Sequence, residues 1–333
     1  MPVIIRPDTG GVVITSLVYL RAVAILLVIG VHAISYGSMT WEQWAWWHRL
    51  WTDSTVFFVI ISGYLFHHLV SDRRTISRFL GQKLRHVFLP YCVLSLLILV
   101  CDGLRNHESP VRVLQDYPLH LLRGDALLPY WFIPAQLGMT AISVVLWYAR
   151  QYARVLVVLP FLILLTVLVP RPVDSIGWSL LHFLPFYLLG IALSKYRQRS
   201  LAWLGRWRSL AWLAVAAVCL YGLSLRYYGV NSLQKGVVFL LLYGWLERRQ
   251  TTGWLESLPG CWMKWLADAS IGLFFLHYLF MEGLGWWLAR HPVMLNPYAM
   301  HALGMAFSLG GSMLAVTLVR LLLPHHSKFL IGC

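Results

Sequence analysis

The sequence contains few charged residues and few cysteines. Asp, Glu, Lys and Arg make up 12% of the 333 residues, about half of the ~25% found in an average soluble domain. No stretch therefore has the composition of a separate soluble catalytic module. The five cysteines are scattered without CxxC spacing, which excludes a cysteine metal site and a disulfide framework.

The sequence also lacks the signature motifs of several common enzyme classes. It has no HExxH zinc motif, no Walker loop, no GxSxG serine elbow and no Rossmann glycine pattern. These absences exclude the classes that the motifs define, and no metal is expected. Any chemistry has to come from isolated polar residues within apolar surroundings.

Apolar residues dominate the chain, at 59% of the sequence with a mean hydropathy of +0.67. They gather in ten runs bounded by charges or turn residues: Val12–Tyr36, Thr55–Val70, Val87–Cys101, Tyr130–Tyr148, Val155–Val169, Trp178–Leu193, Leu210–Leu225, Gly236–Leu246, Ile271–Leu288 and Ala299–Leu323. We expect an all-α fold, a polytopic transmembrane helix bundle of about ten spans. Residues 1–333 then form a single integral-membrane domain.

The distribution of Lys and Arg predicts the orientation. With the N-terminus in the cytoplasm, 18 of the 27 Lys and Arg residues fall in inner segments and eight in outer segments, as the positive-inside rule requires. Both termini are therefore predicted to be cytoplasmic, unless the weakest run, Gly236–Leu246, does not span. The net charge of +14 is interpreted as loop orientation and contact with anionic lipid, with no nucleic-acid partner.

Two ionisable residues interrupt the first apolar run, Arg21 and His32, eleven positions apart. At ~100° per residue, eleven positions return to within ~20° of the starting direction, so both side chains lie on one helix face. Along the axis they are roughly 16 Å apart, about half of the ~30 Å hydrocarbon core. An arginine in a membrane helix costs ~2.5–3.5 kcal/mol, which marks it as a candidate for function.

Other polar residues fall at membrane depth within predicted spans, namely His182, His277, Glu282 and His301. A single histidine at such a position is as often a helix-packing donor as part of a site. The first outer loop carries tryptophans at helical spacing, Trp41, Trp44, Trp47 and Trp51. This pattern is typical of an interfacial helix, and a sugar-stacking platform is the alternative.

Seven sequence blocks, in order, resemble the acyltransferase 3 family. They are LRAVAILLVIGVH, which holds an Arg–x10–His pair, FFVIISGYL, KLRHVFLPY, YWFIPAQL, FLPFYLLGIAL, ASIGLFFLHYLF and HHSKFLIG. The resemblance covers nearly the whole chain. An acid that commonly precedes the arginine in the family is missing, since Leu17 and Val18 stand there. No extracytoplasmic SGNH domain is expected, so the chain would be a stand-alone member.

The resemblance implies an integral enzyme of the bacterial inner membrane. It would move an acyl group, usually acetyl, from cytoplasmic acetyl-CoA to a hydroxyl of a cell-surface or lipid-linked glycan. His32 is expected to be the general base and Arg21 to hold the donor. The residues expected to bind the anionic donor are Lys83, Arg85, Arg73, Arg74 and Arg78; for the last three, ordinary positive-inside residues are the alternative interpretation. The residues expected to position the acceptor are Trp131, His182, Ser270, His277, Glu282 and His301.

Two other classes of function remain open. A carrier or flippase for a lipid-linked sugar would use the same arginine and histidines as a polar path, although no internal repeat typical of carriers is visible. A structural subunit of a polysaccharide export complex would use them to hold helices together.

Overall fold

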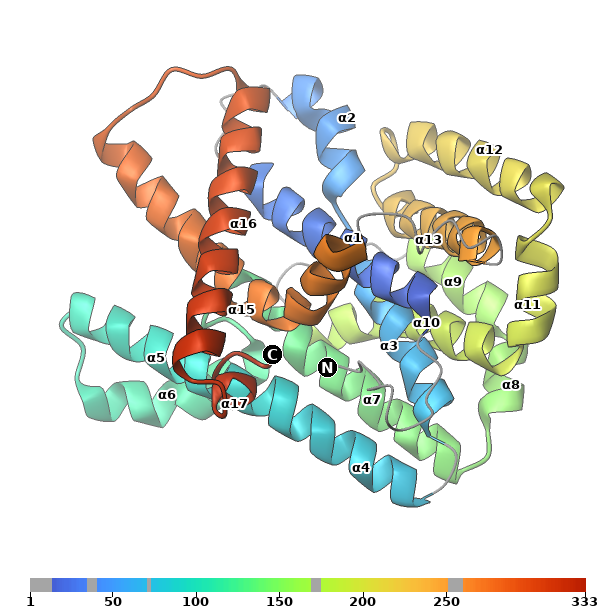
Figure 1. The fold of residues 1–333 in the computed structure, drawn as a ribbon, viewed down its shortest axis with the longest axis horizontal. Helices are drawn as coiled ribbons and strands as arrows, with labels where there is room; N and C mark the ends of the chain where they lie inside the picture. The colour runs from blue at the N-terminus through green and yellow to red at the C-terminus, as the bar shows by residue number, and fades with distance from the viewer. Residues whose placement is uncertain (1–13, 35–40, 71–72, 169–174, 251–259) are drawn as a thin grey trace.

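The computed structural model describes residues 14–34, 41–70, 73–168, 175–250 and 260–333. Within these ranges the chain is helical and has no strand (Figure 1). The elements are α1 Thr15–Ala33, α2 Trp41–Trp51, α3 Thr55–Leu69, α4 Arg73–Lys83, the π-helix η3 Leu84–Phe88, α5 Leu89–Arg105, α6 Pro110–Arg123, the 3-10 helix η4 Leu128–Trp131, α7 Phe132–Tyr148, α8 Tyr152–Val157, α9 Leu159–Leu168, α10 Ile176–Lys195, α11 Arg197–Leu204, α12 Trp207–Ser224, α13 Val230–Gln250, α15 Gly260–Arg290, α16 Pro297–Leu322 and α17 Ser327–Leu330. The predicted all-α fold is confirmed.

Seven helical segments in the described ranges are long and apolar enough to cross a membrane, the longest being the continuous helix Arg73–Arg105. The multi-pass architecture is thereby confirmed. The weakest predicted span, Gly236–Leu246, lies inside α13, a helix of 21 residues. The predicted total of ten spans and the orientation of the termini stay predictions, because α3 and α9 have only 15 and 10 residues.

The helix α1 lies at the centre of the bundle, where it contacts α15 and α16 on one side and α3 and α13 on the other (Figure 1). Leu20, Ile25 and Ile29 are fully buried along it. Near its start, the Ser16 hydroxyl donates to the Glu247 carboxylate of α13. Neighbouring helices thus pack against α1 on more than one side and fix its orientation.

Two glycines allow α3 and α10 to pack with their backbones in contact. A Cβ atom on Gly63 would lie 1.9 Å from the Tyr187 carbonyl oxygen, and one on Gly190 would lie 2.0 Å from the Ile60 carbonyl oxygen. Small residues at helix crossings are the usual means of close packing in membranes. This contact holds α3 rigidly on the side of the bundle where the candidate site lies.

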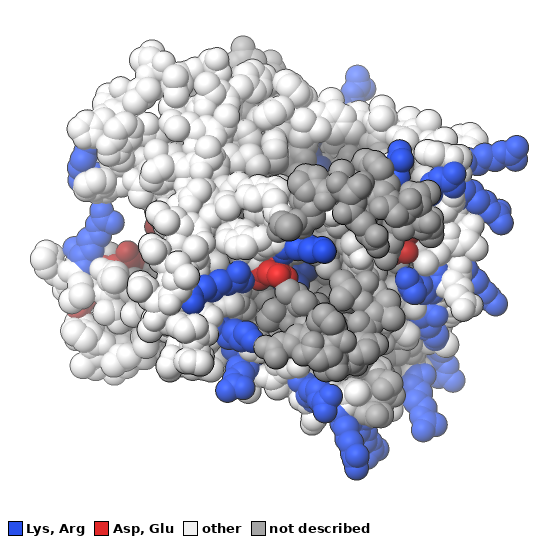
Figure 2. Space-filling model, in the orientation of Figure 1, with Lys and Arg blue, Asp and Glu red and all other residues white. Residues whose placement is uncertain are grey.

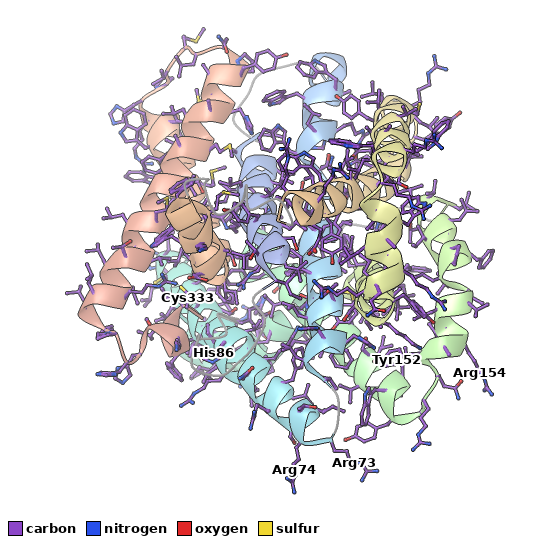
Figure 3. The ribbon with its side chains drawn as sticks, turned by 45° about the vertical axis from the view of Figure 1, so that its right-hand side comes forward. Arg73, Arg74, His86, Tyr152, Arg154 and Cys333 are labelled. Atoms are coloured by element: carbon purple, nitrogen blue, oxygen red, sulfur yellow. The ribbon has the colours of Figure 1, made fainter. Side chains whose placement is uncertain are left out.

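The continuous helix from α4 to α5 contains one π-helical turn, η3, between Lys83 and Pro90. A proline lacks the backbone N–H and its ring crowds the carbonyl four residues earlier, here that of His86. The wider π turn relieves this conflict, and such turns often occur at functional sites. The C-terminal segment packs here, since Gly332 approaches the His86 carbonyl and Cys333 lies against Gly272 of α15 (Figure 3).

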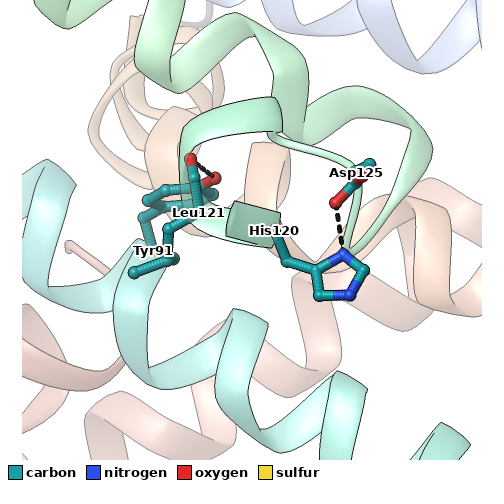
Figure 4. A network of polar contacts seen from close by, with 4 residues as sticks. All are labelled: Tyr91, His120, Leu121 and Asp125. Atoms are coloured by element: carbon teal, nitrogen blue, oxygen red, sulfur yellow. Dashed lines mark hydrogen bonds and ion pairs between the residues drawn. The ribbon is translucent and has the colours of Figure 1, made fainter. Parts of the chain in front are cut away.

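Polar contacts fix the segment that leads into α7 (Figure 4). The Tyr91 hydroxyl of α5 donates to the Leu121 carbonyl of α6 at 2.7 Å. His120 Nδ1 lies 2.7 Å from the Asp125 carboxylate. Between them the chain turns at Gly124, whose φ of 64° favours glycine. The turn places η4 and α7 against the bundle.

Candidate functional site

The two polar residues of α1 meet two polar residues of α15. Arg21 donates to Ser270 Oγ from Nη2 at 2.8 Å and from Nε at 3.2 Å. Eleven residues further along α1, the centroid of the His32 ring lies 5.3 Å from that of His277, which follows Ser270 by seven residues. The two helices therefore run in the same direction at this contact, and one stripe of each forms the site.

His277 has a defined tautomer. The residue is fully buried, and its Nδ1 lies 2.8 Å from the Phe274 carbonyl oxygen. Because a carbonyl only accepts hydrogen bonds, Nδ1 carries the proton and Nε2 presents a lone pair. Nε2 is buried and has no hydrogen-bond partner. His277 thus offers an acceptor beside His32, whose ring also meets the edge of Tyr278 at 5.3 Å.

A cavity of about 100 Å³ opens beside Arg21. Its walls come from α1, α3, α4, η3, α7 and α15. The lining residues are Arg21, Phe58, Ile61, Ser62, Leu65, Phe79, Lys83, Val87, Phe132, Ile133, Gln136, Ser270, Ile271 and Phe274. The cavity is therefore mainly apolar, with a few polar groups that point into it, as is typical of small-molecule sites.

Two cations reach this cavity: Arg21, which is partly buried and has the Asp268 carboxylate in its electrostatic surroundings, and Lys83, which is buried and has no such carboxylate among the described residues. Lys83 is 6% exposed, and its Nζ donates to Thr140 Oγ1 at 3.2 Å. Among the described residues, neither Lys83 nor Arg21 forms an ion pair. Buried cations without a counter-ion are costly. The cavity is therefore electrostatically suited to an anionic or carbonyl oxygen of a ligand.

Gln136 of α7 completes the polar side of the cavity. It is 4% exposed, and both its Nε2 and its Oε1 lack a hydrogen-bond partner. A buried primary amide in this state can pair with one group that both donates and accepts, such as a secondary amide. Sequence reasoning did not identify Gln136, although it is the polar residue of the apolar block YWFIPAQL and that signal was available.

The cavity ends before the two histidines. Neither His32 nor His277 lines it, whereas Phe274 does. The Phe274 ring lies 6.1 Å from that of His277. Phe274 thus borders the cavity and packs beside His277, three residues further along α15.

His301 lies near the end of α1 that carries His32, but both of its ring nitrogens are already hydrogen-bonded within the protein. Its Nε2 donates to the Gly30 carbonyl at 2.9 Å, two residues before His32. Its Nδ1 accepts from Trp47 Nε1 at 3.3 Å. Trp47 and Trp51 pack against it, so this part of the tryptophan stripe faces the bundle; the side chains of Trp41 and Trp44 lie outside the described residues.

Three other predicted acceptor residues are not brought to the cavity. His182 lies 2.9 Å from Ser232 of α13. Glu282 is exposed on α15. Trp131 stacks on Phe183, with 5.7 Å between ring centroids, and immediately precedes the cavity residue Phe132. None of the three is among the residues that line the cavity.

Most of the predicted donor-binding cations lie on the surface. Arg73, Arg74, Arg78 and Arg85 are exposed, whereas Lys83 alone of this group enters the cavity. Arg73 and Arg74 point outward at the lower edge of the molecule, and Arg154 points outward at its right-hand edge (Figure 3). In Figure 2 most Lys and Arg side chains gather along the right and lower edges of the face, where acidic side chains are sparse.

No group of three or more His, Cys, Asp or Glu side chains that could hold a metal occurs in the described ranges. In comparisons with known proteins, a family model described as an acyltransferase domain matches residues 14–319. The match includes α1 through most of α16 and so contains every residue of the cavity. No curated protein and no solved structure matches the chain.

Proposed function

We propose that the chain, which belongs to this acyltransferase 3 family, moves an acetyl group from acetyl-CoA to a glycan hydroxyl. Its membership makes it a membrane acyltransferase in general; the donor, the acceptor and the residue roles are the proposal. The observation that carries it is the pairing of Arg21 with Ser270 and of His32 with His277 along α1 and α15. Along the contact between α1 and α15, Arg21 and Ser270 form the end that binds the donor, and His32 and His277 form the end that carries the general base.

The cavity beside Arg21 is proposed to hold the thioester end of the donor. Arg21 and Lys83 supply charge-assisted hydrogen bonds to the carbonyl oxygens at the thioester end of the pantetheine arm, and such bonds are roughly twice as strong as neutral ones. Gln136 complements a secondary amide of that arm, because it offers one donor and one acceptor. The exposed basic residues Arg73 and Arg74 attract the anionic nucleotide, in keeping with the predicted cytoplasmic position of this segment.

The size of the cavity supports a short acyl group. An engineered apolar cavity of about 150 Å³ takes up benzene, which has six carbon atoms. In proportion, the cavity of about 100 Å³ has room for about four non-hydrogen atoms. An acetyl thioester group has that size, with two carbons, one oxygen and one sulfur. A longer chain requires the surrounding aromatic side chains to move.

His32 is proposed to act as general base. It takes the proton of the glycan hydroxyl while that oxygen attacks the thioester carbonyl carbon. The new C–O bond forms, the C–S bond breaks, and the imidazolium returns its proton to the departing thiolate. A histidine with a pKa near ~6.5 suits this role at neutral pH, and general base catalysis supplies ~10²–10⁴-fold.

This mechanism assigns a role to Phe274. The acyl carbon has to pass from the space beside Arg21 to the histidine pair, and the Phe274 ring both lines that space and lies 6.1 Å from the His277 ring. Rotation of this ring is therefore proposed to accompany transfer. The acceptor reaches His32 from the end of α1 opposite to Arg21, so donor and glycan approach from opposite sides of the bacterial inner membrane.

The experiment uses membranes that contain the protein, CoA carrying a labelled acetyl group, and surface glycan from a host strain that lacks the gene. Label in the glycan is expected with the wild-type protein and is absent in membranes without it. Transport of a lipid-linked glycan without label would favour a carrier and contradict the proposal. Mass spectrometry of the labelled glycan then identifies the acceptor.

A further inference from the structure

A second group of buried polar side chains lies at the end of α1 that carries His32, away from the donor cavity. Its two cations are Arg49 of α2, which is 6% exposed, and Lys235 of α13, which is 4% exposed. Lys235 Nζ donates to the Arg49 carbonyl oxygen at 2.8 Å. Trp51 fills the space beside Gly30, since a Cβ there would lie 2.1 Å from its ring, which fixes the group near His32.

The Arg49 guanidinium has hydrogen bonds left unmade. It lies over the Tyr228 ring, with 4.2 Å between the guanidinium carbon and the ring centroid. Stacking of this kind leaves the edges of the guanidinium plane available for hydrogen bonds. Both Nε and Nη1 are buried and have no hydrogen-bond partner within the part of the chain that the structure describes. Such a buried charged donor is costly unless a ligand satisfies it.

The charges around Arg49 do not balance. Asp53 is the nearby carboxylate, and it accepts from Asn231 Nδ2 at 3.1 Å; it forms no ion pair with Arg49 or Lys235 in the described ranges. Burial and the neighbouring Arg49 charge lower the pKa of His48, and the Asp53 carboxylate opposes this shift. Two cations thus face one carboxylate, and the positive end of α13 lies beside them.

We propose that this Arg49–Lys235 cluster is a binding site for the phosphate group of a membrane-embedded ligand. The net charge of the cluster matches a phosphate that carries a single negative charge. Lys is a strong phosphate partner, and Arg adds directional hydrogen bonds. The cluster lies just beneath the surface, because Tyr228 is 40% exposed. The phosphate belongs to a polyprenyl-linked glycan or to a bilayer phospholipid, and the site needs no acyl transfer to bind it.

The test measures binding by native mass spectrometry of the full chain, purified in an uncharged detergent without donor. Polyprenyl phosphate and phosphatidylglycerol are titrated separately. Arg49→Gln removes the charge, Arg49→Lys keeps it, and Arg226→Gln removes an exposed arginine between α12 and α13 as a matched control. The melting temperature of each variant is recorded, since loss of an unpaired buried cation is expected to leave it unchanged or raise it.

We expect Arg49→Gln to weaken binding by at least tenfold, as the loss of a charge-assisted hydrogen bond implies. Arg49→Lys should restore part of the loss, and Arg226→Gln should bind like the wild type. Loss confined to polyprenyl phosphate assigns the site to a lipid-linked glycan, and equal loss for phosphatidylglycerol assigns it to the bilayer lipid. Equal binding by the wild type and a folded Arg49→Gln variant overturns the proposal. Because no acyl transfer is measured, this outcome is separate from a failure of the transferase assignment.

Discussion

Replacement of Lys83 by methionine separates the effect of the buried cation on folding stability from its effect on donor binding. Methionine has a similar length, so Lys83→Met removes the charge with little change in volume. The ammonium has one hydrogen bond, to Thr140 Oγ1, and Thr140 remains satisfied because its hydroxyl donates to the Gln136 carbonyl at 2.9 Å. Replacing a buried ion by an apolar residue is neutral or stabilising by about 1–4 kcal/mol. The melting temperature should therefore stay the same or rise.

The same substitution should weaken use of the donor. A hydrogen bond to a charged group contributes about 1.5–3 kcal/mol, which corresponds to a rise in KM for acetyl-CoA of about 10- to 150-fold. The assay is transfer of labelled acetyl to glycan in membranes, combined with thermal unfolding in detergent. Lys264→Met, an exposed lysine on α15, is the matched control and should change neither quantity. A lower melting temperature with an unchanged KM would refute the role of Lys83 and make it structural.

Three further predictions test packing, specificity and orientation. Gly63→Ala should destabilise the protein by about 1–3 kcal/mol or more, because the added Cβ would meet the Tyr187 carbonyl oxygen. Gly222→Ala is the control, since the space around Gly222 is open. Thermal unfolding checks both variants, and equal melting temperatures would contradict the α3–α10 contact. Phe132→Ala should raise the ratio of kcat/KM for butyryl-CoA to kcat/KM for acetyl-CoA by about 10-fold or more, since one methylene contributes about 1–3 kcal/mol in an apolar pocket. An unchanged ratio would mean that the acyl group does not bind beside Phe132. A tag appended after Cys333 should be protected from external reagents in intact cells, and labelling there would mean an odd number of spans.

Helix periodicity predicts directions well when the residues share one helix. The spacing of eleven predicted that Arg21 and His32 share a face, and both meet α15. The same arithmetic places Ser270 and His277, seven residues apart, within ~20° of each other, and Glu282, five residues after His277, ~140° away. Glu282 is indeed exposed, so periodicity on α15 alone could have excluded it from the site.

Which helices pack together is not contained in any one helix. The convergence of Lys83, Gln136 and Ser270 in one cavity requires α4, α7 and α15 to be neighbours, and apolar runs of similar composition do not specify their neighbours. For the same reason His182, which faces Ser232 of α13, was not distinguishable from His277. The basic run around Arg85 was identified, but burial decides that Lys83 alone enters the cavity.

The most direct test of the central claim is acetyl transfer by His32→Ala. The measurement is label passed from acetyl-CoA to glycan per unit of inserted protein, with His325→Ala, an exposed histidine near the C-terminus, as the control. The account predicts a loss of at least ~10²-fold for His32→Ala, the contribution of a general base, and no loss for the control. Wild-type transfer by a fully inserted His32→Ala protein would contradict it.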